Sequence, residues 1–298
     1  MNFIVNLHIS IDELRNGGLM VLHKLSYDLA TMGHVVYIFT KPHYPHPNIK
    51  QIPSIRKNPS TLNNNAEYYY YNIPTELDLD NTISIYAEIQ GGNPYKTKHN
   101  VRWILYHTKP HIEKTWKPSD IYFNFRNFRT NRECDNILTT VDYNFDVLYD
   151  MNLSRSGYCY ILHKTTPTNY MDVVKKFNAV NLTGWQKHGY EYLRSQLNKY
   201  EYLILFDHNT FNATASILCG TKVINVTSDS DITPEEYYKS HPKQSLGLAH
   251  GLSEVYHADA TIGMARTNII KIANDEHKTI IDFVNYWKSK LKNLDNTK

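Results

Sequence analysis

One stretch of the chain places polar side chains at a corner of the kind that binds phosphate. Residues 202–206 form an apolar run typical of a buried strand, and a helix-compatible segment and a second apolar run follow at 211–226. The corner after the first run consists of four polar residues, Asp207, His208, Asn209 and Thr210. Ligands, and phosphates in particular, bind open α/β sheets at the carboxyl ends of strands, next to helix N-termini. We therefore expect a ligand at this corner.

A second candidate for anion binding lies near the start of the chain. Gly17 and Gly18 precede four apolar residues spaced by three, four and three positions between 22 and 32, as on one face of a helix. Glycines at a helix start let backbone amides approach an anion closely. The dinucleotide pattern GxGxxG does not occur at this position, so a tight turn without a ligand is the alternative interpretation.

Repeated short apolar runs separated by helical patterns or loops predict a doubly wound α/β sheet to hold these corners. A first series of such runs begins at residue 3 and a second at residue 157, so we expect a boundary between two halves near residues 145–157. The expected strands lie at 3–8, 35–40, 82–88, 101–106, 121–125, 136–140, 157–162, 179–182, 202–206 and 223–226. Residues 275–291 place apolar side chains on one face and predict an amphipathic helix that docks on one of the sheets.

Length and composition limit the classes of protein to consider. A chain of 298 residues accommodates two α/β domains of about 150 residues each. The formal net charge of +3 is small and dispersed, which argues against a nucleic-acid-binding protein. Three widely spaced cysteines, Cys134, Cys159 and Cys219, indicate thiols in a reducing compartment. The first ten residues do not resemble a signal peptide and no apolar run reaches about 18 residues, so we expect a cytoplasmic protein.

Five segments carry motifs that occur in the same order in one enzyme family. They are GGLMVLHKLSYDLA with GH (17–34), YAEIQGGNP with NVRWILY (86–106), RSGYCY with HK (155–164), FDHNT with ASILCG (206–220) and LGLAHGL (246–252). They are similar to the patterns YPEIxxGNP…VVRWLL, YDxxT…AALCG and YGLAYGF, among others. The chain thus resembles small nucleotide-sugar glycosyltransferases of the GT-B type, found in bacterial polysaccharide clusters and large DNA viruses.

The resemblance implies a GT-B-like α/β fold with two Rossmann-like domains and an interdomain cleft. Residues 1–150 would form the acceptor domain, residues 151–275 the donor domain, and residues 276–298 a helix that crosses back to the first domain. The implied reaction moves a sugar from a nucleotide-sugar donor to a glycan or lipid-linked acceptor, with no cofactor or metal. Helix termini and basic side chains would neutralise the leaving diphosphate. A peripheral membrane contact through loops rich in Tyr and Lys and the oligomeric state stay open.

Basic residues after a predicted strand are the implied contacts for the diphosphate. Lys164 is the first choice, because stabilising negative charge on a leaving group often contributes most to catalysis. The alternative is a solvated surface lysine. His163 stands where relatives tend to carry arginine, and it binds phosphate well only when it is protonated. Donor affinity or activity therefore depends on this departure from the family pattern.

The polar corner supplies the other implied donor contacts. Thr210 and the amides after it would touch phosphate, cap the helix, or do both. Asp207 would orient the ribose, bind sugar hydroxyls or buttress the turn. Ala215 occupies the position where many retaining GT-B enzymes carry a ribose-binding glutamate, although part of the family lacks it. The remaining implied donor contacts are Asn209, Gly247, Gly17 and Gly18.

Glu88 is the candidate general base. It follows a predicted strand, and a carboxylate within hydrogen-bond reach of an acceptor hydroxyl can take its proton. The alternative is a structural anchor for the turn at residues 91–94. The implied acceptor contacts are Asn93, His107 and Lys109.

Two sequence patterns resemble metal sites, but their context favours other interpretations. Asp229-Ser-Asp231 mimics a metal-binding DxD but follows a late strand, and the histidines at 43, 46, 107 and 111 have no carboxylate or cysteine at a convincing spacing. No metal is therefore expected. Two alternatives to a glycosyltransferase remain: a sugar-nucleotide epimerase of the same fold, and a non-catalytic nucleotide-sugar-binding protein.

Overall fold

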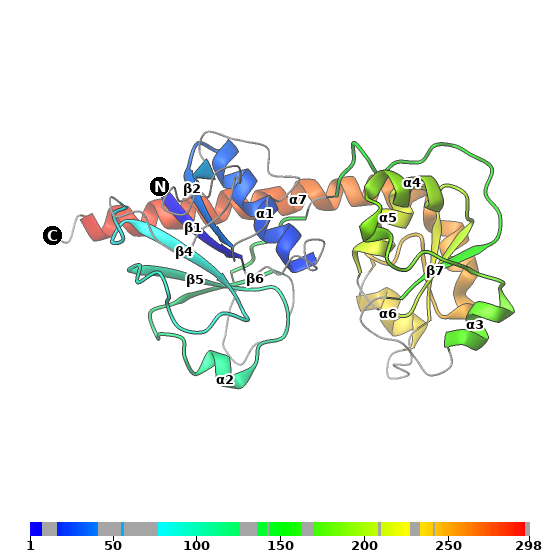
Figure 1. The fold of residues 1–298 in the computed structure, drawn as a ribbon, viewed down its shortest axis with the longest axis horizontal. Coiled ribbons are helices and arrows are strands. Elements are labelled where there is room, and N and C mark those ends of the chain that lie inside the picture. The colour runs from blue at the N-terminus through cyan, green and yellow to red at the C-terminus, as the bar shows by residue number, and fades with distance from the viewer. Residues whose placement is uncertain are drawn as a thin grey trace. The chain divides into compact units, whose positions relative to one another are not determined.

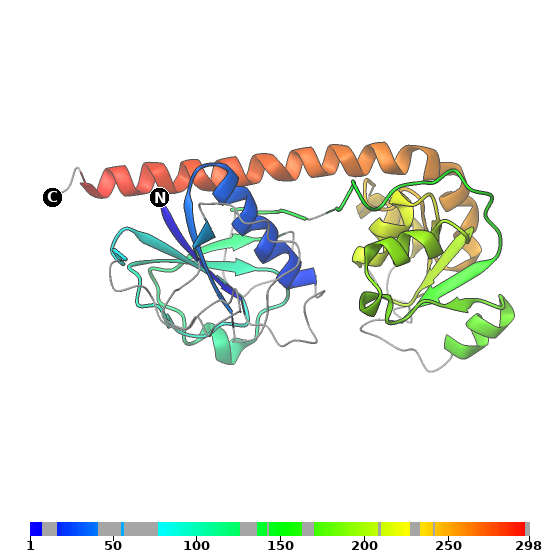
Figure 2. The same cartoon turned by 45° about the horizontal axis from the view of Figure 1, so that its top comes forward.

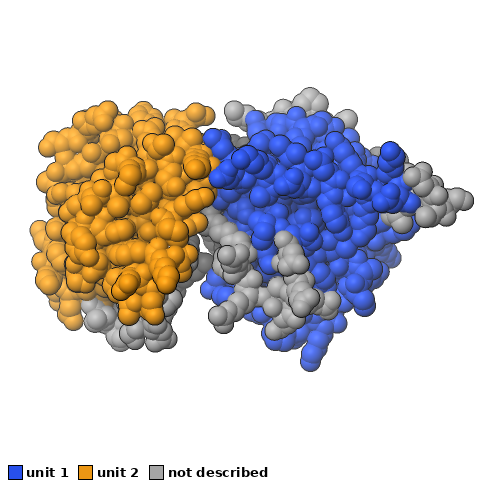
Figure 3. All heavy atoms as spheres, turned by 180° about the vertical axis from the view of Figure 1, so that it is seen from behind, with its two compact units in different colours: residues 1–142, 274–298 blue, residues 143–273 orange. Residues whose placement is uncertain are grey.

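A computed structural model of the chain describes residues 1–7, 17–40, 55–56, 77–125, 136–141, 143–162, 170–207, 210–226, 233–240 and 242–295. The chain forms two compact units (Figure 3). Unit 1 comprises residues 1–142 and 274–298, and unit 2 comprises residues 143–273. Each unit has its own parallel β-sheet.

The sheet of unit 1 has six parallel strands in the order β3-β2-β1-β4-β5-β6 (Figure 1). The strands are β1 (Asn2–Leu7), β2 (Val35–Thr40), β3 (Ile55–Arg56), β4 (Thr82–Ala87), β5 (His99–Ile104) and β6 (Ile121–Asn124). Helix α1 (Gly17–Thr31) connects β1 to β2, and the short helix α2 (Pro110–Glu113) lies between β5 and β6 in the chain. Every residue of β4 and β5 is buried, which is typical of central strands in a parallel sheet.

Two helices complete the core of unit 1 through apolar faces. α1 buries Leu22, Leu25 and Leu29, which recur every three to four residues along the helix. The last part of helix α7 adds a second apolar face to the same core, formed by Ile280, Phe283, Val284 and Trp287. The hydroxyl of Thr279, a residue of α7, accepts a hydrogen bond from the N–H of Thr139 at 2.9 Å. The same hydroxyl lies 3.0 Å from the carbonyl oxygen of Thr139, so polar contacts also fix α7 to unit 1.

The sheet of unit 2 has five parallel strands in the order β11-β10-β9-β7-β8. The strands are β7 (Tyr158–Ile161), β8 (Val180–Asn181), β9 (Tyr202–Leu205), β10 (Lys222–Asn225) and β11 (Leu248–His250). They alternate with helices α3 (Tyr170–Lys176), α4 (Tyr190–Leu197), α5 (Phe211–Leu218) and α6 (Pro234–Ser240), and with single 3-10 turns at Trp185–Lys187 and Leu252–Glu254.

Helix α7 (Val255–Asp295) is a single helix of 41 residues that belongs to both units (Figure 2). Within unit 2 it buries Ala258, Ala265 and Ile269. The sequence predicts a helix only from residue 275, so its first 20 residues were missed. Their buried face consists largely of alanines, which give a weak hydrophobic periodicity.

The prediction of an α/β protein with parallel sheets is confirmed in both units. The expected strand at 136–140 is wrong, because these residues contribute only one isolated bridge, between Asn124 and Ile137. The GT-B assignment and the cleft remain predictions. Among the described residues, no helix combines the length and the apolar character that are needed to cross a bilayer.

Candidate functional site

In each unit the strand order reverses at one pair of neighbouring strands. In unit 1 the chain continues from β1 outward to β2 and β3, and from β4 outward to β5 and β6. In unit 2 the corresponding pair is β7 and β9. In open α/β sheets, ligands bind outside the carboxyl ends of the strands at such a reversal. These two sheet edges are therefore the candidate sites, one in each unit.

Glu88 directly follows β4, at the reversal in unit 1. Its carboxylate is buried and Oε2 accepts a hydrogen bond from the N–H of Leu105 at 3.0 Å. Burial raises the pKa of Glu88, and hydrogen bonds from backbone N–H groups, including those of Leu105 and Tyr106, oppose this shift only in part. The carboxylate therefore anchors the end of β5 to the end of β4. A raised pKa at a strand end is also what a general base requires.

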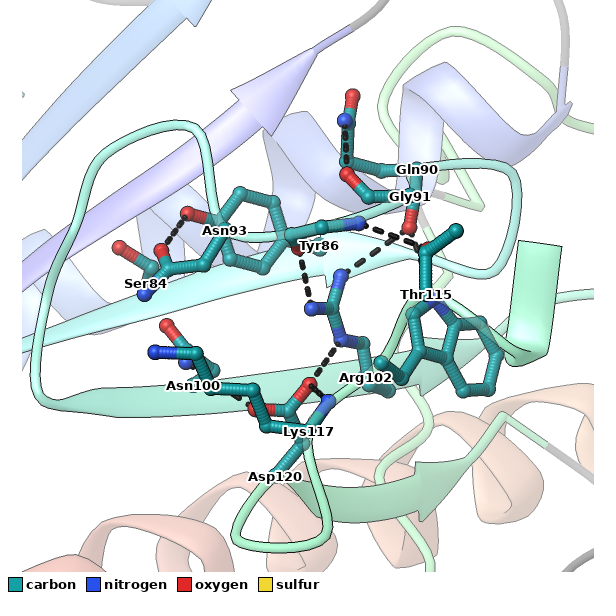
Figure 4. Close-up of polar contacts among 12 residues, drawn as sticks. Ser84, Tyr86, Gln90, Gly91, Asn93, Asn100, Arg102, Thr115, Lys117 and Asp120 are labelled. Atoms are coloured by element: carbon teal, nitrogen blue, oxygen red, sulfur yellow. Dashed lines mark hydrogen bonds and ion pairs between the residues drawn. The ribbon is translucent and has the colours of Figure 1, made fainter.

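The loop that follows Glu88 is held by Arg102, a fully buried residue of β5 (Figure 4). Arg102 Nη1 donates to the carbonyl oxygen of Gln90 at 3.1 Å, and Nη2 donates to that of Gly92. Its guanidinium lies over the rings of Tyr86 and Trp116, at 4.7 and 5.4 Å from their centroids. The loop at the end of β4 therefore has a defined conformation.

Asp120 compensates the buried charge of Arg102. Its Oδ2 lies 2.8 Å from Arg102 Nε, and both side chains are fully withdrawn from solvent. The remaining lone pairs of Asp120 accept from Asn100 Nδ2 (3.1 Å) and from the N–H of Lys117 (3.2 Å). Sequence reasoning missed this network, although an arginine within an apolar strand indicates a buried ion pair, because a buried charge needs a partner.

Asn93 belongs to the same loop and is already engaged in it. Its Oδ1 accepts from the hydroxyl of Tyr86 at 2.7 Å, and its Nδ2 donates to the carbonyl of Thr97 at 2.8 Å. Both ends of the amide thus hold the loop. The predicted acceptor contacts His107 and Lys109 follow β5 and are exposed, beside the strand end that Glu88 anchors.

The end of β1 joins this edge through polar contacts. Asn6 Nδ2 donates to Gln90 Oε1 at 3.2 Å, and the hydroxyl of Tyr95 donates to Asn6 Oδ1. Gly17 and Gly18 form the first turn of α1, the helix that follows β1. The residues between them and β1 lie outside the described part of the chain.

The reversal in unit 2 brings Asp207 and Thr210 to one strand end. Asp207 follows β9 and is buried, and Thr210 is the N-cap residue of α5. Thr210 has the extended backbone of an N-cap (φ −95°, ψ 152°) but makes no side-chain capping bond. Its buried Oγ1 has no hydrogen-bond partner in the described part of the chain. His163, Lys164 and Asn209, predicted for this edge, lie outside the described residues.

Gly247 does not lie with Asp207 and Thr210. It precedes β11, at the amino edge of the sheet, and its N–H donates to Thr261 Oγ1 at 2.8 Å. Its φ is +74°, and a Cβ here would lie 3.0 Å from Ile262 Cδ1 and 3.2 Å from Ala265 Cβ. The packing of α7 therefore explains this glycine without a ligand. At the carboxyl end of β11, His250 stacks on Tyr237 with ring centroids 4.5 Å apart.

Two further motif residues of unit 2, Arg155 and Gly220, make structural contacts. Arg155 Nη2 contacts Asp150, Asn198 Oδ1 (3.0 Å) and the carbonyl of Cys219 (2.8 Å), so it satisfies the end of α5. A Cβ on Gly220, whose φ is +79°, would overlap this ion pair. Ala215 is fully buried within α5.

The described residues contain no group of three or more His, Cys, Asp and Glu side chains placed to hold a metal ion. The Asp229-Ser-Asp231 motif lies outside them. No protein-family model matches the chain, and no curated protein matches it significantly. The glycosyltransferase assignment therefore depends on the five motifs and on the positions of their residues in the fold.

Proposed function

We propose that the chain is a nucleotide-sugar-dependent glycosyltransferase of the GT-B type, with the donor bound by unit 2 and the acceptor by unit 1. One observation supports this most strongly. Residues predicted from the motifs, Glu88 in one unit and Asp207 and Thr210 in the other, lie at the strand-order reversals of two separate parallel sheets. A transferase needs two binding sites, and each such reversal is a place where ligands bind.

On this proposal, unit 2 stabilises the leaving nucleoside diphosphate. The N-terminal amides of α5 and the hydroxyl of Thr210 donate to phosphate oxygens, and Lys164 and protonated His163 add positive charge. The unpartnered Thr210 hydroxyl supports this role, because a ligand oxygen would satisfy it. Asp207 stabilises the turn between β9 and α5 or binds a hydroxyl group of the ligand. No metal is invoked.

Unit 1 supplies the group that activates the acceptor. Burial raises the pKa of Glu88, which makes its carboxylate a stronger base for a sugar hydroxyl. The amides at the end of β5 and the loop held by Arg102 fix where this carboxylate lies. His107 and Lys109 are exposed on the segment after β5 and are proposed to contact the acceptor.

Turnover tests this proposal. Release of nucleoside diphosphate from UDP-, GDP-, dTDP- and CMP-sugars, with CMP for the last, is measured with and without a panel of glycan acceptors. We expect acceptor-dependent release from one donor, with Glu88→Gln reducing kcat and leaving donor binding intact. An intact sugar nucleotide with an inverted stereocentre, formed without any acceptor and without net release of the nucleotide, would identify an epimerase instead. Donor binding with no turnover on any acceptor would favour a non-catalytic binding protein.

A further inference from the structure

The part of α7 that belongs to unit 2 has an unusual outer face. Its three large apolar residues Tyr256, Met264 and Ile270 are 67%, 58% and 42% exposed. At about 100° per residue, they lie on the side of the helix opposite the buried Ala258, Ala265 and Ile269. The residues between them on this side are small or uncharged: Ala260, Gly263 and Thr267. We call these six outward-facing residues, 256, 260, 263, 264, 267 and 270, the α7 outer face.

Charged side chains border this face in a self-complementary order. Asp259 and Arg266 lie along the same edge, seven residues apart, and both residues are exposed. Asp259 contacts Lys222 Nζ (2.7 Å) and the hydroxyl of Tyr202 (2.8 Å), yet its side chain is still 44% exposed. It can therefore accept a further hydrogen bond from a cation of another molecule.

We propose that the α7 outer face binds the same face of a second copy of this chain, with the two helices antiparallel. In a two-fold pairing whose axis passes beside residues 262 and 263, residues equally far from that point face one another. Asp259 of each copy then lies opposite Arg266 of the other, which gives two identical ion pairs. Met264 packs near Ala260, and Tyr256 near Ile270, so apolar side chains meet apolar ones. In a parallel two-fold pairing this edge would instead face the opposite edge of the partner helix, so Asp259 and Arg266 would not pair.

The chemistry of the face favours a second copy over a lipid surface. Small residues between large ones let two helix backbones approach closely, whereas a lipid-binding helix needs a basic border. Here the border is mixed in sign, with Asp259 and Arg266 on one edge and the exposed Lys271 toward the other. A helix pair of this length buries less than the roughly 1,200–2,000 Å² of a standard stable interface, so the dimer should dissociate in the micromolar range.

Sedimentation velocity of the full chain over a concentration series tests the proposal. We expect reversible dimerisation that Met264→Glu and Arg266→Glu each weaken by roughly tenfold or more, because each places a charge at an apolar contact or opposite Asp259. Ile281→Glu is the matched control. Ile281 is a 40% exposed apolar residue of the same helix outside this face, and its substitution should leave the dimer unchanged. Wild-type chain that stays monomeric, or a dimer that both variants leave intact, would overturn the proposal.

Cysteine cross-linking tests the antiparallel geometry in a chain carrying Cys134→Ser. Cys159 and Cys219 are buried. A Cβ on Gly263 meets no atom within 4 Å, so Gly263→Cys fits this helix. Under mild oxidation Gly263→Cys should form covalent dimers and Tyr256→Cys should not, because two residues 256 lie far apart in an antiparallel pair. Efficient cross-linking at 256 would contradict this geometry.

Sedimentation with lipid vesicles tests the alternative that the α7 outer face binds a membrane surface. Wild type and Met264→Glu are sedimented with phosphatidylcholine–phosphatidylserine vesicles, with retention of fold checked by the unfolding midpoint. We expect no binding of either chain to the vesicles. Binding by a monomeric wild type that Met264→Glu abolishes would assign the α7 outer face to a membrane surface and overturn the dimer.

Discussion

Arg102 and Asp120 form an ion pair of 2.8 Å that is fully buried beneath the loop at the end of β4. The pair connects three parts of unit 1, because Arg102 also binds the carbonyls of residues 90 and 92 while Asp120 binds Asn100. The guanidinium therefore links the interior of β5 to the loop that follows the candidate base Glu88. This relationship makes the loop a rigid part of the fold.

Removing the charge of Asp120 should destabilise the chain strongly. Asp120→Asn leaves Arg102 with an uncompensated buried charge, so we expect a loss of roughly 3–5 kcal/mol in the free energy of unfolding. Urea denaturation measures this loss. The double variant Arg102→Met with Asp120→Leu should recover only part of it, because it leaves no buried charge but removes the partners of the carbonyls of residues 90 and 92 and of the Asn100 amide. A loss below about 1 kcal/mol for Asp120→Asn would show that solvent reaches the pair.

Two glycines should respond oppositely to alanine. Gly247→Ala adds a Cβ against Ile262 and Ala265 at a φ of +74°, and we expect roughly 1–3 kcal/mol of destabilisation. Gly263→Ala adds a Cβ to open space within α7 and should stabilise the chain by roughly 0.5–1 kcal/mol. Thermal unfolding of both variants at low protein concentration measures the difference. Equal effects would contradict the packing role of Gly247.

His34 should make the chain less stable in acid. Burial, the positive N-terminus and Lys288 lower the pKa of His34 from 6.5 to about 4. Between these values the unfolded chain binds a proton that the folded chain excludes, so stability falls as the pH falls through this range. Above this pH range, His34 is neutral in both the folded and the unfolded chain, so it does not make the stability depend on pH. His34→Gln should flatten this part of the stability–pH curve, and an unchanged curve would contradict the assigned pKa shift.

Thr210→Val separates stability from ligand binding. The buried Thr210 hydroxyl has no partner among the described residues, so valine, which has nearly the same shape, should leave the unfolding midpoint unchanged or slightly raised. If the hydroxyl binds a donor phosphate as proposed, the same variant should weaken nucleotide-sugar binding. Calorimetric titration measures the affinity for the nucleotide sugar, and thermal unfolding of the same preparation measures the unfolding midpoint. A clear loss of stability would indicate a hydrogen bond within the chain.

The regular parts of the fold could be predicted because their residues follow simple periodicities. Residues 82–87 are all buried and apolar or small, and Leu22, Leu25 and Leu29 mark one face of α1. The start of α7 could not be predicted in this way, since Ala258 and Ala265 form its buried face while Tyr256 and Met264 point outward. The hydrophobic periodicity of this segment therefore gives little indication of a helix.

The positions of candidate residues were predictable only near the end of an apolar run. Glu88 directly follows β4, and Asp207 and Thr210 lie between β9 and α5, because polar residues after an apolar run mark the edge of the sheet. The packing of Gly247 against α7 could not be predicted, because a glycine that packs against a helix and one that admits a ligand look alike in a sequence. The role of Arg102 depends on Asp120, a partner 18 residues away, which spacing alone does not indicate.

The most direct test of the proposed donor site is thermal stabilisation by UDP-, GDP-, dTDP- and CMP-sugars of the wild type and three variants. Ligands that bind only the folded chain raise the melting temperature. We predict a shift with one nucleotide that Lys164→Ala and Thr210→Val both reduce and that the exposed-surface control Lys175→Ala retains. No shift with any nucleotide sugar, or one that Lys164→Ala and Thr210→Val leave unchanged, would contradict a donor site in unit 2.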